Sequence, residues 1–197
     1  MIKKNNIEMV ILASRSPRRI ALLKQVGIDC IVLPADIDES ALAKELPENY
    51  VKRLALEKAL ATATNMKREY SHLAVLAADT TVCFNGEILG KPESDADASK
   101  MLKKLSGNVH EVHTAVAVCF KGKAKVIIST TQVEMMRLTT DAISAYIASG
   151  EHRDKAGSYG IQGRAAAWIR RIEGSYSGVM GLPLFETVQL INKIAVK

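Results

Sequence analysis

The chain of 197 residues is 48% apolar, which is enough to bury the core of one domain or of two small lobes that share a cleft. No stretch approaches the roughly 20 uninterrupted apolar residues that a membrane-spanning helix needs, so we expect no contact with a membrane. The net charge of +6 fits a nucleic-acid surface or a pocket for a polyanionic small molecule, but the scattered basic residues and the aromatic content of 5% argue against a nucleic-acid partner.

The first half of the chain alternates segments typical of strands with segments typical of helices. Residues 9–13 are an apolar run that predicts a buried strand; it is too short for the core of a signal peptide, so we expect a cytoplasmic protein. Ser16 as N-cap and Pro17 as first helical residue then begin a helix, which Gly27 ends. The pattern next predicts a strand at 30–33, an acidic loop at 34–47, a helix at 49–70, a strand at 73–78 and a hairpin, 82–84 with 87–89, around Asn85-Gly86.

The second half combines a hairpin with helices. Its predicted elements are a helix at 95–105 ended by Gly107, strands at 112–120 and 125–136 joined at Lys121-Gly122, a helix from Thr140-Asp141 to residue 148, strands at 165–172 and 177–180, and a helix at 184–194. Because hairpins and crossovers both occur, we predict an α/β fold whose strands run in mixed directions.

The cysteines and histidines do not predict a metal site. Cys30, Cys83 and Cys119 are far apart in the sequence and lie among apolar neighbours, so we expect buried free thiols. His110 and His113 resemble a metal-binding pair, but a spacing of three places them on opposite faces of a strand. This spacing argues against a zinc site.

A cationic loop follows the first strand at residues 14–19, with the sequence SRSPRR. Backbone N–H groups at the start of the following helix and the helix dipole attract anions. An arginine side chain can bind two phosphate oxygens at once. The loop lacks the glycines and the final Lys-Ser/Thr of a Walker loop. It predicts an anion site; the alternative is a capped helix with exposed arginines.

Two acidic positions could serve hydrolysis. Asp79 and Thr80 follow the apolar strand, where open α/β sheets bind ligands, and a carboxylate there can hold a hard cation or accept a proton from water. The alternative is a turn or a helix cap. Glu39, one of three carboxylates in a short stretch of the acidic loop, could complete a Mg²⁺ or Mn²⁺ site or lie in solvent.

Three further positions carry weaker signals. Lys58 falls on the apolar stripe of a helix, where an ammonium must snorkel, pair or serve a site. Lys91 precedes a proline at a strand end and could meet a phosphate or lie on the surface. The segment 154–163 has glycines that let a backbone approach a ligand, and the Gln162 amide could read a base edge; the alternative is a structural turn.

These motifs, in this order, resemble the signature set of the Maf family: SRSPRR at 14–19, ADT at 78–80, GKP at 90–92, DKAGSYGIQG at 154–163 and GSYSGVMGLP at 174–183. The resemblance covers residues from about 11 to 191 and implies one domain over residues 1–197. It implies a two-lobed mixed sheet with flanking helices and a central nucleotide cleft, as in inosine-triphosphate pyrophosphatases. It also implies hydrolysis of nucleoside triphosphates to monophosphate and pyrophosphate, with Mg²⁺ or Mn²⁺ as cofactor, and a homodimer.

The resemblance assigns roles to individual residues. It makes Asp79 the proton acceptor that activates water, and Asp79 and Glu39 the metal ligands. Base preference falls to Arg18, Thr80 and Gln162, and phosphate binding falls to Ser14, Arg18, Arg19, Lys58 and Lys91.

The segment 156–159, with Thr80 and Gln162, resembles the branch that acts on dTTP and UTP more than the branch that acts on 7-methyl-GTP. Other or modified pyrimidine nucleotides remain open as substrates. Arg15 departs from the pattern, since a glycine is usual between the two serines, and it adds charge beside the phosphate loop. The alternative function is a non-catalytic nucleotide sensor or regulator, which would bind a nucleotide without releasing pyrophosphate.

Overall fold

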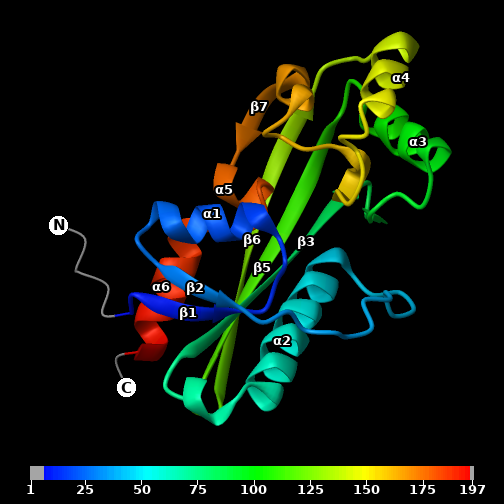
Figure 1. Cartoon of the computed structure of the whole chain (residues 1–197). Coiled ribbons are helices and arrows are strands. Elements are labelled where there is room, and N and C mark those ends of the chain that lie inside the picture. Colours follow the sequence, from blue (N-terminus) through cyan, green and yellow to red (C-terminus); the bar gives the residue numbers. More distant parts are fainter. Residues whose placement is uncertain (1–6, 196–197) are drawn as a thin grey trace.

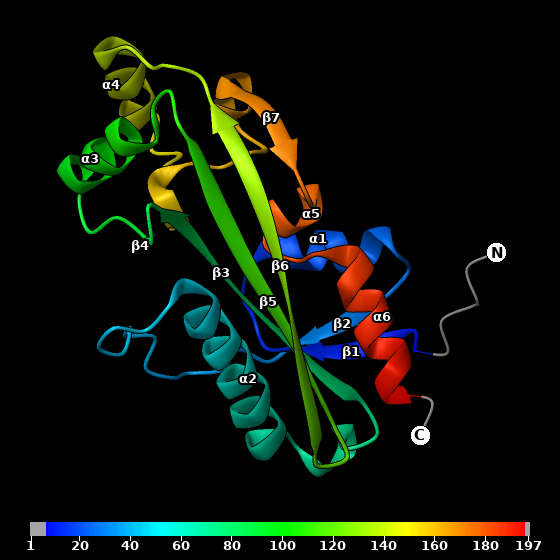
Figure 2. The same cartoon turned by 180° about the vertical axis from the view of Figure 1, so that it is seen from behind.

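The computed structural model describes residues 7–195, so the predicted single domain over residues 1–197 reaches beyond the described residues at both ends. The described strands form one seven-stranded sheet, in the order β2-β1-β3-β5-β6-β7 with β4 beside β3 (Figures 1 and 2). β1 runs parallel to β2 and β3, and the other neighbouring strands are antiparallel. The strands are β1 (Met9–Leu12), β2 (Asp29–Val32), β3 (Ala74–Phe84), β4 (Glu87–Leu89), β5 (Val109–Phe120), β6 (Lys123–Met135) and β7 (Ile169–Glu173).

Helices cover both faces of this sheet, which confirms the predicted mixed α/β fold. α2 packs on one face of β3 and β5, while α1 and α6 pack on the other (Figure 2). α3 and α4 lie side by side at the far end of the long strands and enclose a third core cluster there (Figure 1). The helices are α1 (Pro17–Gln25), α2 (Pro47–Asn65), α3 (Asp95–Leu105), α4 (Thr140–Ala148), α5 (Tyr176–Val179) and α6 (Leu184–Ala195), with short 3₁₀ helices at Arg68–Tyr70 (η1), Ala156–Ser158 (η2) and Arg164–Trp168 (η3).

The strand β3 is apolar at consecutive positions because both of its faces are covered. Val75 and Ala77 belong to the core under α2, whereas Leu76 and Ala78 belong to the core that α1 and α6 cover. Successive side chains of a strand point to opposite faces of the sheet, and this alternation continues in β3 beyond the apolar run. Asp79 therefore faces the side of α2, and the next residue faces the side of α1.

Most predicted elements are confirmed, several of them to the residue. The helix at 95–105 has the predicted bounds, and the helices that begin at Pro17 and Leu184 start where predicted. The hairpin between β3 and β4 turns at Asn85-Gly86, whose φ angles of 50° and 79° suit a tight hairpin turn.

Several boundaries were wrong. The helix predicted at 49–70 ends at Asn65, and only a 3₁₀ turn follows. The strand predicted at 165–172 begins as η3 and becomes extended at Ile169, and the segment predicted as a strand at 177–180 lies largely within the short helix α5. Side-chain caps also differ: Thr139, not Thr140, caps α4, and the Ser16 side chain makes no cap hydrogen bond although it stands at the N-cap position.

The strand predicted to stop at residue 78 was also wrong, and this error concerns the site. β3 continues through Asp79 to Phe84 because β5 pairs with it over the whole stretch from Val75 to Cys83. Antiparallel pairing supplies the backbone hydrogen bonds that the sequence pattern alone did not reveal.

All three cysteines lie in the described part of the chain and are free thiols. Cys83 and Cys119 are buried as predicted, while Cys30 is half-buried. Within residues 7–195, no helix combines the length and the apolar character that crossing a lipid bilayer requires.

Candidate active site

A cavity of about 840 Å³ lies between the start of α1, the acidic loop, α2 and the segment 154–163. It forms where β1 stops: β1 ends at Leu12, opposite Leu76, so β3 continues past it without a parallel neighbour on that side. Every residue that the sequence predicted for the site lines this cavity: Ser14, Arg18, Arg19, Glu39, Lys58, Asp79, Thr80, Lys91 and Gln162. The fold therefore brings together segments that are as much as 148 positions apart, from residue 14 to residue 162.

Asp79 lies at the floor of the cavity in a buried ion pair with Lys58 of α2. Its Oδ1 accepts a hydrogen bond from Lys58 Nζ at 2.6 Å, and the exposed fractions of the two residues are only 7% and 8%. Burial raises the pKa of Asp79, and the charges of Lys58 and Arg19 oppose this rise. Lys58 was predicted to contact phosphate; it pairs with carboxylates here, and a phosphate contact stays a prediction.

Glu39 completes a three-residue arrangement, because its Oε1 lies 2.9 Å from the same Lys58 ammonium. Burial acts against its ionisation, but the hydrogen bond and the charge of Lys58 prevail, so the pKa of Glu39 is lowered. Two carboxylates from distant segments thus converge on one point. The acidic loop is therefore not merely solvated, since it delivers one carboxylate to the floor of the cavity.

Two residues of α2 that the sequence analysis missed hold the acidic loop in place. The Tyr50 hydroxyl donates to the backbone oxygen of Glu39 at 3.0 Å, and Arg53 Nη2 donates to the backbone oxygen of Ser40 at 3.0 Å. Burial first, and then the charges of Asp79 and Glu39, raise the pKa of Tyr50 to about 12, so it stays a donor. Tyr50 and Arg53 are three positions apart, which places both on one face of the helix. This spacing is the sequence signal that could have drawn attention to them.

Arg19 of α1 links the cationic loop to Thr80, on the face of β3 opposite to that of Asp79. Its Nη1 donates to Ser14 Oγ at 3.0 Å, its Nε to the Gly181 carbonyl at 2.8 Å, and its Nη2 to Thr80 Oγ1 at 3.3 Å. Burial lowers the pKa of Arg19, and the charge of Asp79 opposes this effect. Arg19 is therefore a fixed charge in the wall of the cavity, held by protein groups on three of its nitrogens.

The mouth of the cavity carries further positive charge. Arg15, Arg18 and Lys91 are exposed there, and Lys155 is half-buried. Lys155 Nζ donates to the Glu151 carbonyl at 2.5 Å, and burial together with the charge of Arg18 lowers its pKa. Lys155 belongs to the glycine-containing segment 154–163, but the sequence pattern predicts no role for it.

The segment 154–163 owes its glycines to packing within the protein. Gly157 has φ of +66°, and a Cβ placed there would lie 2.8 Å from Val82 Cγ2. A side chain at Gly163 would meet Glu151. The predicted close approach is therefore observed toward neighbouring side chains. Gln162 is exposed and lines the cavity.

The donor set at the floor fits a hard divalent cation. Mg²⁺ and Mn²⁺ prefer carboxylate oxygens, and Asp79 and Glu39 present one oxygen each to the point that the Lys58 ammonium contacts. A positive charge is already stabilised at this point. The two carboxylates could therefore share such a cation with phosphate oxygens.

The chain is similar to known proteins over nearly its whole length. The model of the family described as Maf-like protein matches residues 9–194. The chain is 54% identical over 191 residues to a dTTP/UTP pyrophosphatase of Methylobacillus flagellatus, covering 97% of this chain and 95% of that protein. It is 49% identical over 196 residues to a dTTP/UTP pyrophosphatase of Nitrosomonas europaea, with 95% of both covered, and 45% identical over 187 residues to a nucleoside triphosphate pyrophosphatase of Haemophilus ducreyi, with 94% and 95% covered.

Among solved structures, the Staphylococcus aureus Ham1 protein aligns with a TM-score of 0.47 and 20% identity, over 64% of this chain and 71% of that chain.

Proposed function

This chain belongs to the Maf family, and on that premise we propose that it hydrolyses dTTP and UTP to the nucleoside monophosphate and pyrophosphate. Relatives that share about half of its residues over nearly its whole length are named for this activity. The structural observation that carries the proposal is the pair of carboxylates, Asp79 and Glu39, which both contact Lys58. They lie in the same cavity as the arginines of the cationic loop. A site that only bound nucleotides would need the arginines but not this pair of carboxylates, one buried at Asp79 and one more exposed at Glu39.

The triphosphate is placed by the cationic side of the cavity. In the first turn of α1 the backbone N–H of Arg18 is available, because Pro17 has none and the N–H of Arg19 donates to the Ser16 carbonyl. The exposed Arg18 and Lys91 side chains line the same cavity and supply positive charge for phosphate oxygens. Ser14 adds a hydroxyl, and the Arg19 guanidinium supplies a fixed positive charge. This arrangement binds the charged part of the substrate and leaves the Gln162 side of the cavity for the base.

Asp79 serves as the proton acceptor for the attacking water. The buried Lys58 ammonium at 2.6 Å favours the ionised carboxylate against the effect of burial, which leaves a base with a stabilised negative charge. Held by Asp79 and Glu39, Mg²⁺ or Mn²⁺ would polarise the α-phosphate and neutralise charge on the departing pyrophosphate. Tyr50 and Arg53 fix the loop that carries Glu39, so the second carboxylate stays beside the first.

Base preference is assigned to Arg18, Thr80 and Gln162. The exposed Gln162 amide has both a donor and an acceptor, which suits the edge of a pyrimidine. The Thr80 hydroxyl is held by Arg19 and lies 3.0 Å from Thr114 Oγ1, so its position is set by two neighbours. A cytoplasmic location belongs to the same proposal, because three free thiols are typical of a reducing compartment.

The test is the product set from a panel of nucleotides. The protein is incubated with Mg²⁺ or Mn²⁺ and dTTP, UTP, CTP, GTP, ATP or 7-methyl-GTP, and the products are separated by ion exchange. We expect monophosphate and pyrophosphate, formed fastest from dTTP and UTP. Diphosphate with orthophosphate would contradict the reaction, and tight binding without turnover would favour the sensor.

A further inference from the structure

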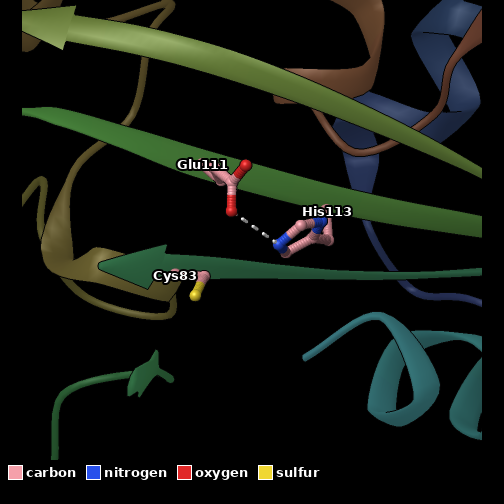
Figure 3. Close-up of side chains that lie close together, drawn as sticks. All are labelled: Cys83, Glu111 and His113. Carbon is pink, nitrogen blue, oxygen red and sulfur yellow. Dashed lines mark ion pairs between the residues drawn. The ribbon is translucent and has the colours of Figure 1, made fainter. Parts of the chain in front are cut away.

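A second group of metal-binding side chains lies outside the active cavity, on β3 and β5. Cys83 of β3 stands directly opposite Glu111 of β5 in the antiparallel register, and His113 is two residues further along β5. The Cys83 sulfur, a ring nitrogen of His113 and a carboxylate oxygen of Glu111 all lie within 4.8 Å of one another. Figure 3 shows the three side chains projecting from the same side of the two strands.

The spacing of these atoms is close to that of ligands around one ion. His113 Nε2 lies 3.5 Å from Glu111 Oε2 (dashed in Figure 3), and two ligands at tetrahedral zinc distances stand about 3.3 Å apart. A sulfur and a nitrogen bound to one zinc ion are about 3.6 Å apart. Because the ligand atoms here lie within 4.8 Å of one another, the sulfur needs to move by no more than about 1 Å to reach such a position. A rotation of the Cys83 side chain supplies such a movement without any change in the strands.

The histidine is oriented as a ligand. Its ring is 1% exposed, and its Nδ1 lies 2.9 Å from Thr130 Oγ1 on the neighbouring strand β6. A hydrogen bond at the second ring nitrogen fixes the ring and leaves Nε2 pointing at Glu111, as in many metal-bound histidines. His110 and His113 point to opposite faces of β5, but this does not exclude a metal site at His113. The other two ligands there are Glu111 of the same strand and Cys83 of β3.

The local charge also favours a cation. Burial raises the pKa of the Cys83 thiol, and the negative charges of Glu111, Glu48 and Glu87 add to this rise.

The location is separate from the candidate active site. Cys83 lies four residues beyond Asp79 on β3, which is about 13 Å along a strand. Neither Cys83, Glu111 nor His113 lines the described cavity.

We propose that Cys83, Glu111 and His113 bind one borderline transition-metal ion of the Zn²⁺ class, distinct from the Mg²⁺ or Mn²⁺ of the active cavity. One thiolate, one imidazole and one carboxylate form a mixed donor set that suits Zn²⁺ and Co²⁺ and not the oxygen-seeking Mg²⁺. Three protein ligands leave a fourth position for water, and Glu111, with 45% of its side chain exposed, keeps the site open to solvent. The ion ties β3 to β5 beside the hairpin that leads to Lys91.

The test is a Co²⁺ titration of the reduced, full-length protein in the presence of excess Mg²⁺, followed by absorption spectroscopy. Binding through Cys83 produces a thiolate-to-cobalt charge-transfer band that saturates at one equivalent and that Zn²⁺ abolishes by displacement. The variant Cys83→Ser loses the band, while Cys119→Ser, which alters another buried cysteine of the same strand pair, keeps it. Asp79→Asn also keeps it, because that carboxylate belongs to the other site.

Glu111→Gln guards against a folding artefact, since its side chain is partly exposed and its loss leaves both strands intact. It retains the band but weakens Co²⁺ binding by about tenfold or more, as loss of a ligand costs at least as much as loss of an outer-shell partner. Absence of a thiolate band in the wild-type protein overturns the proposal. A band that survives in Cys83→Ser, or an unchanged affinity in Glu111→Gln, overturns it as well.

Discussion

The ammonium of Lys58 lies 2.6 Å from Asp79 Oδ1, and both side chains are almost wholly buried at the floor of the cavity. One partner comes from the middle of a helix and the other from the middle of a strand, 21 positions apart. Burial raises the pKa of Asp79, and the ammonium of Lys58 opposes this rise by favouring the ionised carboxylate. The catalytic account depends on this pair, and the first predictions concern its two members.

Removing the charge of Lys58 should move the activity to higher pH. In Lys58→Met, burial still raises the pKa of Asp79 but the opposing ammonium is gone, so the base becomes protonated at a higher pH. The acid limb of the pH profile of kcat should therefore shift upward. Lys52→Met, on the same helix but outside the cavity, is the control and should keep the wild-type profile; an unshifted limb in Lys58→Met would mean that Lys58 does not control Asp79.

The same substitution should also lower stability. Removing one partner of a buried ion pair costs about 3 to 5 kcal/mol in the free energy of unfolding, and protonation of Asp79 in the variant recovers part of that loss. Urea unfolding at neutral pH measures the difference. A free energy of unfolding equal to that of the wild-type protein would contradict the buried pair.

Replacing Asp79 by Asn should remove the base and keep the fold. Turnover of dTTP should fall on the order of 100-fold or more, since a positioned general base contributes about that factor. Single-turnover rates with saturating Mg²⁺ measure the effect, and Asp141→Asn, an acidic residue at the start of α4, is the matched control. Near-normal turnover by a folded Asp79→Asn protein would exclude the role.

Gln162 should affect selectivity more than catalysis. Because its exposed amide is assigned to the base edge, Gln162→Ala should lower kcat/KM for dTTP and UTP and leave the slow turnover of a poor substrate nearly unchanged. Competition assays with paired nucleotides measure the ratio directly. Gln132→Ala, exposed on β6, should change neither value; an equal loss for every nucleotide in Gln162→Ala would assign Gln162 to phosphate binding or to structure.

His110 should make stability depend on pH. Its Nε2 lies 2.7 Å from the Tyr159 hydroxyl, and burial lowers the pKa of His110 from 6.5 to about 4. The unfolded chain takes up the proton first, so this contribution is complete above pH 6.5 and is lost as the pH falls toward 4, by about 3 kcal/mol in all. Unfolding free energies measured across this range should show the loss in the wild-type protein and not in His110→Gln.

The chemistry of the serine and arginine cluster at the start of a helix favoured an anion site without any knowledge of the fold. The residues alone left a structural alternative open at Asp79, Glu39 and Lys58, and the resemblance to the Maf family assigned their roles. The bounds of β3 could not be predicted, because Asp79 is a poor strand former that becomes a strand residue only through the pairing of β3 with β5.

Residues whose side chains hold the backbone of a distant loop could not be identified from the sequence. Tyr50 contacts the main chain of Glu39, eleven positions away in a loop, and no local pattern encodes that contact. The segment at 177–180 was mistaken for a strand because its few residues carry no clear period. In the structure, Ser175 accepts a hydrogen bond from the Gly178 N–H and begins a helical turn there.

Hydrolysis of dTTP in water enriched in ¹⁸O tests the central claim most directly, because it shows which phosphorus the water attacks. Attack at the α-phosphorus, with Asp79 as base, places the label in the monophosphate, and mass spectrometry of the separated products locates it. We predict labelled dTMP and unlabelled pyrophosphate. Label in the pyrophosphate would mean attack at the β-phosphorus and would contradict the proposed arrangement of the substrate in the cavity.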